Sequence, residues 1–142
     1  MKGRVFMVAQ PSPAPRRMSV DEWRELERTS HDIKHEYIDG RVYAMSAGSL
    51  ARSCIALNVC SALERALLAA GKPCSVYNSD AAVRLSSRRY TYPDASVTCD
   101  ERDQPTPDKT EIQSPLVIVE VLSTSTEAYD RGEKFGYYQP GP

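Results

Sequence analysis

The sequence predicts a mixed α/β (α+β) fold in which a long helix packs on one face of a mixed β-sheet. Apolar side chains recur every three or four positions across residues 49–70, which is the period of an amphipathic helix. Residues 116–119, Leu-Val-Ile-Val, form an apolar run typical of a strand that is covered on both faces. Shorter strand-like runs, separated by turn residues, lie around these two segments, so we expect helices and strands to share one core.

The composition limits the classes of protein. The chain has 142 residues with 18 Lys and Arg against 19 Asp and Glu, so a nucleic-acid surface would be local or formed by an oligomer. No apolar run approaches the roughly 20 residues that span a bilayer, and no export signal is evident, so we expect no membrane contact and a cytoplasmic location. The four cysteines have no CxxC spacing, and we expect them to be reduced rather than joined in disulfides.

The N-terminal part predicts an arm followed by one domain. Residues 1–17 are rich in proline, and we expect a flexible arm there, with a single domain at 18–142. A capping box at 19–22, Ser-Val-Asp-Glu, predicts a helix that ends near Arg28.

A hairpin and the long helix come next. Asp39-Gly40 is the strongest hairpin signal in the chain, and Glu36 lies on the first of the two strands that it joins. The long helix, 49–70, ends before Gly71, a natural C-terminal cap. Its predicted apolar stripe consists of Ile55, Val59, Ala62, Leu63, Ala66, Leu67 and Ala70.

Arginines at two places are candidates for phosphate contact. Arg52 lies on the first turn of the long helix. Strands are predicted at 74–77 and 81–85, followed by a polar turn at 86–90. The most plausible local basic patch, around this turn, consists of Arg84, Arg88 and Arg89. A solvated surface would also explain both groups of arginines.

Two acidic residues lie beside predicted strands. Asp94 precedes a short strand at 95–97, and an exposed acidic loop at 100–114 follows. Glu120 continues the apolar run 116–119, where burial requires it to be protonated, paired or bound to a cation. On neighbouring strands the two carboxylates could hold a hard divalent cation, Mg²⁺ or Mn²⁺. Separately, Asp94 could cap a turn and Glu120 could form a plain ion pair.

A helix is predicted from Thr126 to Tyr138. Its apolar side would consist of Tyr129, Phe135 and Tyr138, and its polar side of Asp130, Arg131, Glu133 and Lys134. Lys134 could point back toward Glu120. In a phosphodiester hydrolase, a lysine at this place can position a water or stabilise developing charge.

Taken together, these motifs resemble the Uma2 (Uma-two) family of restriction-endonuclease-like proteins, in the PD-(D/E)xK nuclease superfamily. The resemblance is carried by KHEYIDGRVYAMSAGS, YPDASV, VIVEVLS and STSTEAYDRGEKFGYY, in that order. It implies a restriction-endonuclease-like fold that acts on DNA, with Asp94 and Glu120 on a metal ion and Lys134 as the catalytic lysine. It also implies that Glu36 is a further acidic member of the site; the alternative for Glu36 is an exposed strand residue.

The chain departs from the family pattern at three places. Leu122 stands two residues after Glu120, where the superfamily has its lysine, and this is why the catalytic lysine is assigned to Lys134. Arg52 stands where the family often has a histidine. In the family, further strands usually follow the last helix, so we expect an open edge or apolar face that a partner covers, and a homo-oligomer.

Two functional hypotheses follow. The first is a Mg²⁺-dependent or Mn²⁺-dependent endonuclease that hydrolyses DNA. The second is a catalytically silent, oligomeric nucleic-acid-binding or regulatory domain on the same scaffold, favoured by Leu122 and Arg52. Metal binding by Asp94 and Glu120 separates the two.

Overall fold

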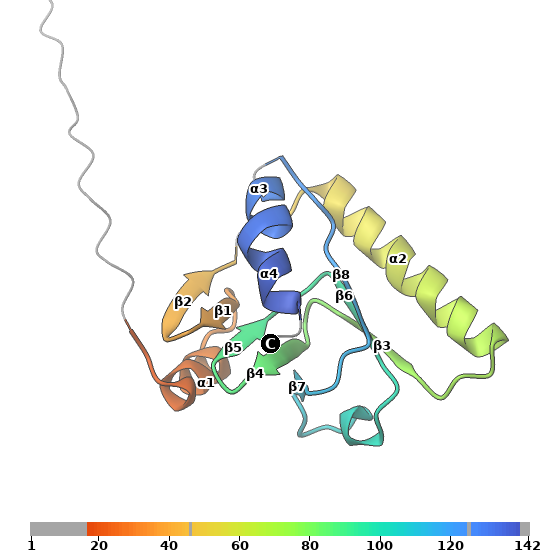
Figure 1. The fold of residues 1–142 in the computed structure, drawn as a ribbon, viewed down its shortest axis with the longest axis horizontal. Helices are drawn as coiled ribbons and strands as arrows, with labels where there is room; N and C mark the ends of the chain where they lie inside the picture. The colour runs from red at the N-terminus through yellow and green to blue at the C-terminus, as the bar shows by residue number, and fades with distance from the viewer. Residues whose placement is uncertain (1–16, 46, 125, 140–142) are drawn as a thin grey trace, which may run out of the picture.

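The computed structural model describes residues 17–45, 47–124 and 126–139 of the chain (Figure 1). It has an α+β fold, as the sequence predicts, with the strands divided between two sheets. The predicted arm, residues 1–17, lies outside the described residues except for Arg17. No helix in the described ranges is both long and apolar enough to cross a membrane.

The larger sheet has five strands in the order β2-β1-β5-β4-β7 and is mixed, because only β4 and β7 run parallel. The smaller sheet has three antiparallel strands in the order β3-β6-β8. The strands are β1 (His35–Ile38), β2 (Arg41–Ala44), β3 (Ser75–Asn78), β4 (Ala82–Ser86), β5 (Arg89–Thr91), β6 (Ala95–Thr98), β7 (Glu111–Ile112) and β8 (Val117–Val119).

Helices cover both sheets. Helix α1 packs against β1, whereas α2 lies along β3 and β6 (Figure 1). The last three helical segments follow one another without a break and are called the C-terminal helix, in which η2 is a π-helical turn. The helical segments are α1 (Val20–Thr29), α2 (Leu50–Ala69), the 3₁₀ turn η1 (Glu101–Asp103), α3 (Glu127–Tyr129), η2 (Asp130–Lys134) and α4 (Phe135–Tyr138).

The predicted first helix and hairpin are confirmed. The Ser19 side chain accepts a hydrogen bond from the Glu22 amide, and the Glu22 carboxylate accepts one from the Ser19 amide, so the capping box starts α1. The ring of Trp23 is buried against Tyr90, and its indole nitrogen donates to the His35 carbonyl at 2.7 Å. Asp39 and Gly40 have positive φ angles of 50° and 89°, as a two-residue hairpin turn requires.

Helix α2 has the predicted ends, but its predicted apolar stripe is only partly correct. Gly71 adopts a positive φ of 62°, and its amide donates to the Leu68 carbonyl, as in a Schellman cap. None of the α2 side chains, all of which the structure describes, is fully buried. Four of the seven predicted positions are exposed, namely Ile55, Ala62, Ala66 and Ala70. The three-stranded sheet is narrow, so only one stripe of the helix can pack on it.

Strand β8 is also less covered than its sequence suggests. Val117 is 41% exposed and Leu116 is 69% exposed, so the prediction of a strand covered on both faces is wrong. The reason is position: β8 is the edge strand of the smaller sheet and, among the described strands, pairs only with β6.

The predicted exposed loop at 100–114 contains an ordered anchor. It includes η1 and β7, and Asp103 within it is only 4% exposed. The Asp103 carboxylate accepts hydrogen bonds from the Thr98 hydroxyl and from the amides of Gln113 and Ser114. Three donors offset the cost of burying the charge, so this carboxylate holds the two ends of the loop together.

Two of the four cysteines form a disulfide, so the prediction of reduced cysteines is wrong for this pair. Ser75 of β3 lies opposite Thr98 of β6, and this register brings the next residues outward, Cys74 and Cys99, into contact. The pairing depends on strand register across 25 positions of sequence, which no local cysteine spacing reveals. Cys54 and Cys60 are free thiols.

We expect the disulfide to stabilise the smaller sheet. Closing a loop across 25 positions reduces the entropy of the unfolded chain by the equivalent of about 3 kcal/mol of folding free energy. Replacing Cys74 and Cys99 together with serine should therefore lower the free energy of unfolding by about this amount, measured by urea titration. Cys54→Ser, at an exposed position, is the matched control. Equal stability of the double variant and the wild type would contradict the prediction.

Candidate active site

The two predicted metal-binding carboxylates lie at the same end of the smaller sheet. Asp94 immediately precedes β6 and Glu120 immediately follows β8. Ala95 pairs with Val119 across the two antiparallel strands, so the residues just beyond them are brought side by side. One Asp94 oxygen also accepts the Val121 amide at 2.8 Å, which ties the two segments together.

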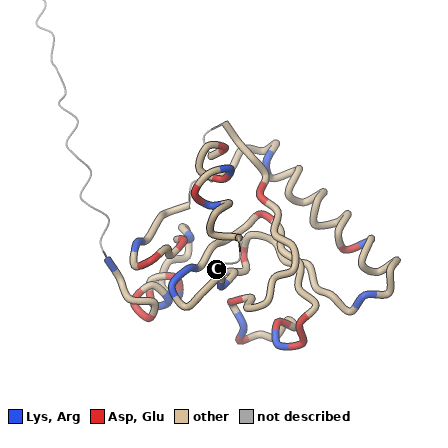
Figure 2. Tube along the Cα trace, viewed as in Figure 1, with Lys and Arg blue, Asp and Glu red and all other residues tan. Residues whose placement is uncertain are grey.

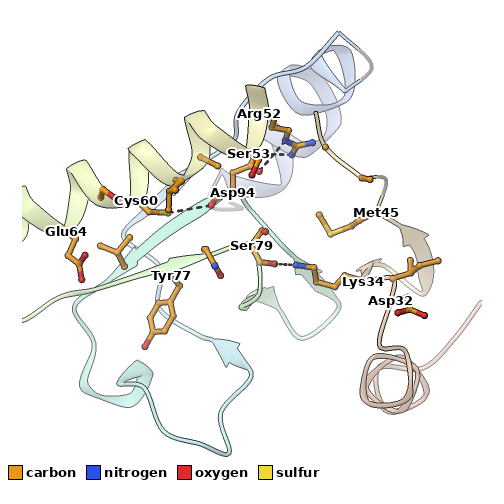
Figure 3. A pocket seen from close by; sticks show the side chains of 18 residues that line it. Asp32, Lys34, Met45, Arg52, Ser53, Cys60, Glu64, Tyr77, Ser79 and Asp94 are labelled. Atoms are coloured by element: carbon orange, nitrogen blue, oxygen red, sulfur yellow. Dashed lines mark hydrogen bonds and ion pairs between the residues drawn. The ribbon is translucent and has the colours of Figure 1, made fainter. Parts of the chain in front are cut away.

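Arg52 forms an ion pair with the Asp94 carboxylate. Its Nε lies 3.3 Å from Asp94 Oδ1 and its Nη2 lies 2.9 Å from Asp94 Oδ2, a two-point contact from the first turn of α2 (Figure 3). Burial acts to lower the pKa of Arg52, but its hydrogen bonds and attraction to Asp94 outweigh burial and raise it. The predicted phosphate-contact residue is therefore held by an acid in this structure.

Lys134 lies between two acids from different sheets. Its ammonium nitrogen is 2.8 Å from Glu36 Oε1 and 2.8 Å from Glu120 Oε1. Lys134 is only 3% exposed and Glu36 only 4%, so the alternative of an exposed strand residue is excluded for Glu36. The Tyr92 amide also donates to Glu36 at 3.2 Å, and the Tyr138 hydroxyl donates to Glu120.

Glu36 and Glu120 share the Lys134 ammonium, and this sharing affects the pKa values of Lys134 and Glu120. Burial acts to lower the pKa of Lys134, but Glu36 and Glu120 together outweigh it and raise that pKa. For Glu120, burial raises the pKa, and the attraction of Lys134 with the Tyr138 hydrogen bond offsets this only in part. Lys134 is thus a firmly charged ammonium, whereas Glu120 is a carboxylate with less stabilisation than its burial demands.

The C-terminal helix turns a polar side toward the core, so its predicted apolar side is wrong in part. Phe135 is 56% exposed, whereas Asp130 and Lys134 are buried. Asp130, Lys134 and Tyr138 follow at intervals of four residues and so share a side of the helix. Placing Lys134 against two buried carboxylates is worth more than burying one phenyl ring, because an uncompensated buried charge costs several kcal/mol.

Sequence reasoning missed Asp130 and Tyr138 as members of the site. The available signal was their spacing of four residues on either side of Lys134. Asp130 is 7% exposed, and its Oδ2 atom is buried without a hydrogen-bond partner among the residues that the structure describes. Its charge is nonetheless felt by Arg52, whose pKa it helps to raise.

These side chains form what we call the charge cluster. It consists of Glu36, Arg52, Asp94, Glu120, Asp130 and Lys134. With every group ionised, four carboxylates face two cations, which leaves a formal charge of −2. Burial of such a surplus is unfavourable, so the cluster as a whole favours an additional cation.

The donor set fits one divalent cation with few protein ligands. Glu120 Oε2 is buried and has no hydrogen-bond partner within the described part of the chain, so a carboxylate oxygen beside Asp94 is available. No group of three His, Cys, Asp or Glu side chains in that part is arranged to hold one ion. Mg²⁺ commonly uses one or two carboxylates and completes its shell with water, so Asp94 and Glu120 suffice.

A hollow of about 1120 Å³ leads to the cluster from the side of α2. Its wall includes Arg52, Cys60 and Asp94, with Lys34 and Tyr77 elsewhere in the lining (Figure 3). The Cys60 thiol points at the Asp94 backbone carbonyl, and burial followed by Asp94 raises its pKa, so it is a neutral wall residue. Solvent and small ligands can therefore reach Asp94 through this opening.

Comparison with known proteins places these residues in a family. A family model named Uma2, described as "Putative restriction endonuclease", matches residues 20–141. The uncharacterized protein slr1290 of Synechocystis sp. is 40% identical over 142 residues, which cover 96% of this chain and 70% of that protein. The uncharacterized protein sll1609 of the same organism is 28% identical over 110 residues, which cover 77% of this chain and 61% of that protein.

A solved structure shares the fold. The crystal structure of "a putative nuclease belonging to DUF820" from Anabaena variabilis matches with a TM-score of 0.65 at 16% identity. The match covers 82% of this chain and 65% of that one. At this identity the likeness shows a common fold alone. The chain spans 61% to 70% of the length of these matched proteins, so the activity of a complete relative does not transfer to it directly.

The raised pKa of Glu120 predicts how stability depends on pH. Because its folded-state pKa lies above the ordinary value of 4.5, the group stabilises the fold below pH 4.5, and this contribution is lost as the pH rises through the folded-state pKa. In Glu120→Gln the side chain does not ionise, so the variant does not lose this contribution as the pH rises. The free energy of unfolding of the variant, relative to that of the wild type, should therefore increase from pH 4 to pH 7. Urea titrations at several pH values measure the difference, and a difference that shrinks with pH would contradict it.

Proposed function

Because the chain belongs to the Uma2 family, we propose that it is a metal-dependent endonuclease that hydrolyses phosphodiester bonds in DNA. One observation carries the proposal: Asp94 and Glu120 meet at the ends of paired strands, with Lys134 held 2.8 Å from Glu120, inside a cluster that has a surplus of negative charge. If Lys134 and Glu120 formed an ion pair with only a structural role, the surrounding surplus of negative charge would not be needed.

Four members of the charge cluster, together with Tyr138, have a role in the proposed reaction. Asp94 and Glu120 would hold Mg²⁺ or Mn²⁺, which when bound supplies Lewis acidity to a phosphate oxygen and to a water. Lys134 would donate a hydrogen bond to the attacking water and stabilise charge on the phosphate. Glu36 is a positioning residue, because it holds the Lys134 ammonium from the opposite side. Tyr138 likewise orients Glu120 through its hydroxyl.

The proposed DNA partner needs a local basic surface, since the chain has a net charge of −1. Positive residues gather near the turns β1–β2 and β4–β5 (Figure 2), but Asp39 partly neutralises the predicted basic patch. Arg89 pairs with Asp39 at 3.0 Å and its guanidinium lies 5.0 Å from the centre of the Tyr137 ring. Arg88 is 65% exposed and remains the more available contact for a phosphate. We retain a cytoplasmic location as part of the proposal.

A second function is favoured by one specific observation. The two-point contact of Arg52 with Asp94 supplies a positive charge where a metal would bind. A catalytically silent domain that binds or regulates nucleic acid would need no metal, and Arg52 would then serve as the permanent counter-ion of Asp94. Such a domain would bind DNA equally well in the presence of a chelator.

The nuclease proposal predicts different effects at the metal ligands and at the lysine. Asp94→Asn and Glu120→Gln should weaken Mn²⁺ binding at least about tenfold, because each removes a charged ligand. Lys134→Met should keep Mn²⁺ binding but lower cleavage by about 10²-fold or more, since it removes a donor to the reacting groups. Calorimetry measures binding, and labelled single-stranded and double-stranded DNA report cleavage.

A matched control for these variants is Glu133→Gln, at an exposed position of the C-terminal helix. It should leave both binding and cleavage unchanged. Cleavage by Glu120→Gln at the wild-type rate would sink the nuclease proposal. DNA binding that persists in a chelator, with no Mn²⁺ bound by the wild type, would establish the silent domain instead.

We also propose a homo-oligomer that covers α2. Leu50, Leu57 and Leu68 are 91%, 68% and 74% exposed, and their spacings of seven and eleven residues place them on one side of the helix. Only three of the 20 residues of α2 are charged, namely Arg52, Glu64 and Arg65 (Figure 2), so the exposed leucines favour an apolar contact with a second copy.

This arrangement predicts a concentration-dependent assembly. Replacing Leu57 and Leu68 together with glutamate should weaken self-association at least about tenfold, because two charges would be buried in the contact. Sedimentation velocity over a range of protein concentrations measures it. Thr29→Glu, on the surface of α1, is the control. A monomeric wild type at all concentrations would overturn the proposal.

A further inference from the structure

Asp130, like Arg52, is a member of the charge cluster to which the proposed reaction gives no task. It lies on η2 with 7% of its surface exposed, and its Oδ2 atom has no hydrogen-bond partner among the residues described. A buried acceptor left without a hydrogen bond destabilises the fold, and more so when it is charged. Such a cost is tolerated at a functional site when another state of the protein satisfies the group.

One cation lies within electrostatic reach of Asp130. The carboxylates of Asp94, Glu120 and Asp130 all attract the Arg52 guanidinium, and only Asp94 is in direct contact with it. Arg52 also lines two hollows. One leads along α2 toward β3, and the other, of about 720 Å³, lies between the start of α2 and residues 122–124 with Glu127, at the beginning of the C-terminal helix.

The two elements that carry Arg52 and Asp130 are close in space. Figure 1 shows α3 and the start of α2 at the same end of the molecule, and the shared lining of the second hollow confirms that they are neighbours. Arg52 is a long side chain on the first helical turn, where rotation about its side-chain bonds moves the guanidinium without moving the backbone. Arg52 therefore has open space beside it and is attracted by the Asp130 carboxylate.

Metal binding would create the need for that second position. Both Asp94 oxygens accept from Arg52, and one also accepts the Val121 amide. A divalent cation on Asp94 would lie beside the guanidinium, and like charges a few ångströms apart repel strongly in a buried site. Metal and Arg52 therefore compete for one carboxylate.

We propose that Asp130 is the second acceptor for Arg52, so that binding of a divalent cation at Asp94 and Glu120 moves the Arg52 guanidinium from Asp94 to Asp130. The inference rests on the metal site of the proposed function and adds two positioning residues to it. The exchange keeps every charge paired: the metal ion replaces the guanidinium on Asp94, and the guanidinium satisfies the carboxylate that the metal-free protein leaves unpaired. The metal affinity then depends on the difference in free energy between the Arg52–Asp94 pair and the Arg52–Asp130 pair.

A double-mutant cycle tests this exchange. The variants are Arg52→Gln, Asp130→Asn and the two combined, each titrated with Mn²⁺ by calorimetry. Asp130→Asn should weaken Mn²⁺ binding about tenfold, because Arg52 then has no second acceptor, and Arg52→Gln should strengthen it by a similar factor. In the Arg52→Gln background, Asp130→Asn should change the affinity less than about twofold.

The control is again Glu133→Gln, which removes a negative charge from the same helix at an exposed position and should leave Mn²⁺ affinity unchanged. Equal weakening by Asp130→Asn in both backgrounds would overturn the exchange, because Asp130 would then act on the metal directly. Unchanged Mn²⁺ affinity in Asp130→Asn would overturn the exchange but not the proposed metal site. No Mn²⁺ binding by any variant, Arg52→Gln included, would overturn the metal site and the exchange together.

A direct readout does not depend on affinity. In protein labelled with ¹⁵N-arginine, the Nε–H signal of Arg52 is identified by its absence in Arg52→Gln. Addition of Mg²⁺ should move this signal in the wild type to a new position that Asp130→Asn does not reach. A signal that keeps its position when Mg²⁺ saturates the protein would show that Arg52 stays on Asp94, and would overturn the proposal.

Discussion

The contact of Lys134 with Glu36 and Glu120 is the interaction on which the rest of this structure depends. Glu36 belongs to β1 in the larger sheet, Glu120 follows β8 in the smaller sheet, and Lys134 belongs to the C-terminal helix. Three elements far apart in the sequence are thus joined at one buried ammonium. Because a buried ion pair is stabilising only when its geometry is good and its charges are balanced, the positions of all three elements are constrained together.

The orientation of the C-terminal helix follows from this contact. An ordinary amphipathic helix would bury Phe135 and expose Lys134, and here the reverse is observed. The π-helical turn η2 begins at Asp130 and ends at Lys134, so the local widening of the helix falls on the two buried charged residues. Such turns are rare and frequently lie at functional sites, which agrees with the surplus of negative charge around them.

Structural features away from the cluster hold the scaffold that positions it. The disulfide Cys74–Cys99 joins β3 to β6 at the end of the sheet opposite to Asp94, and Asp103 fixes the loop between β6 and β8. Trp23 packs against Tyr37 and Tyr90 and so joins α1 to β1 and β5. These contacts hold the strands that carry Asp94, Glu120 and Glu36 in register, while α2, with its exposed leucines, supplies Arg52 from one end.

The sequence by itself determined the first helix, the hairpin, the long helix and most members of the candidate site. Local signals sufficed for the capping box of α1, the Asp39-Gly40 turn and the ends of α2, because each depends on residues within a few positions of one another. The pairing of Asp94 with Glu120 could be inferred from their places beside adjacent strands. Only the tertiary structure decided that Arg52 contacts Asp94, that Asp130 is buried, that Cys74 meets Cys99 and that Phe135 faces outward. These outcomes depend on strand register and on the balance of charges brought together from distant positions, and neither quantity is encoded in a local pattern.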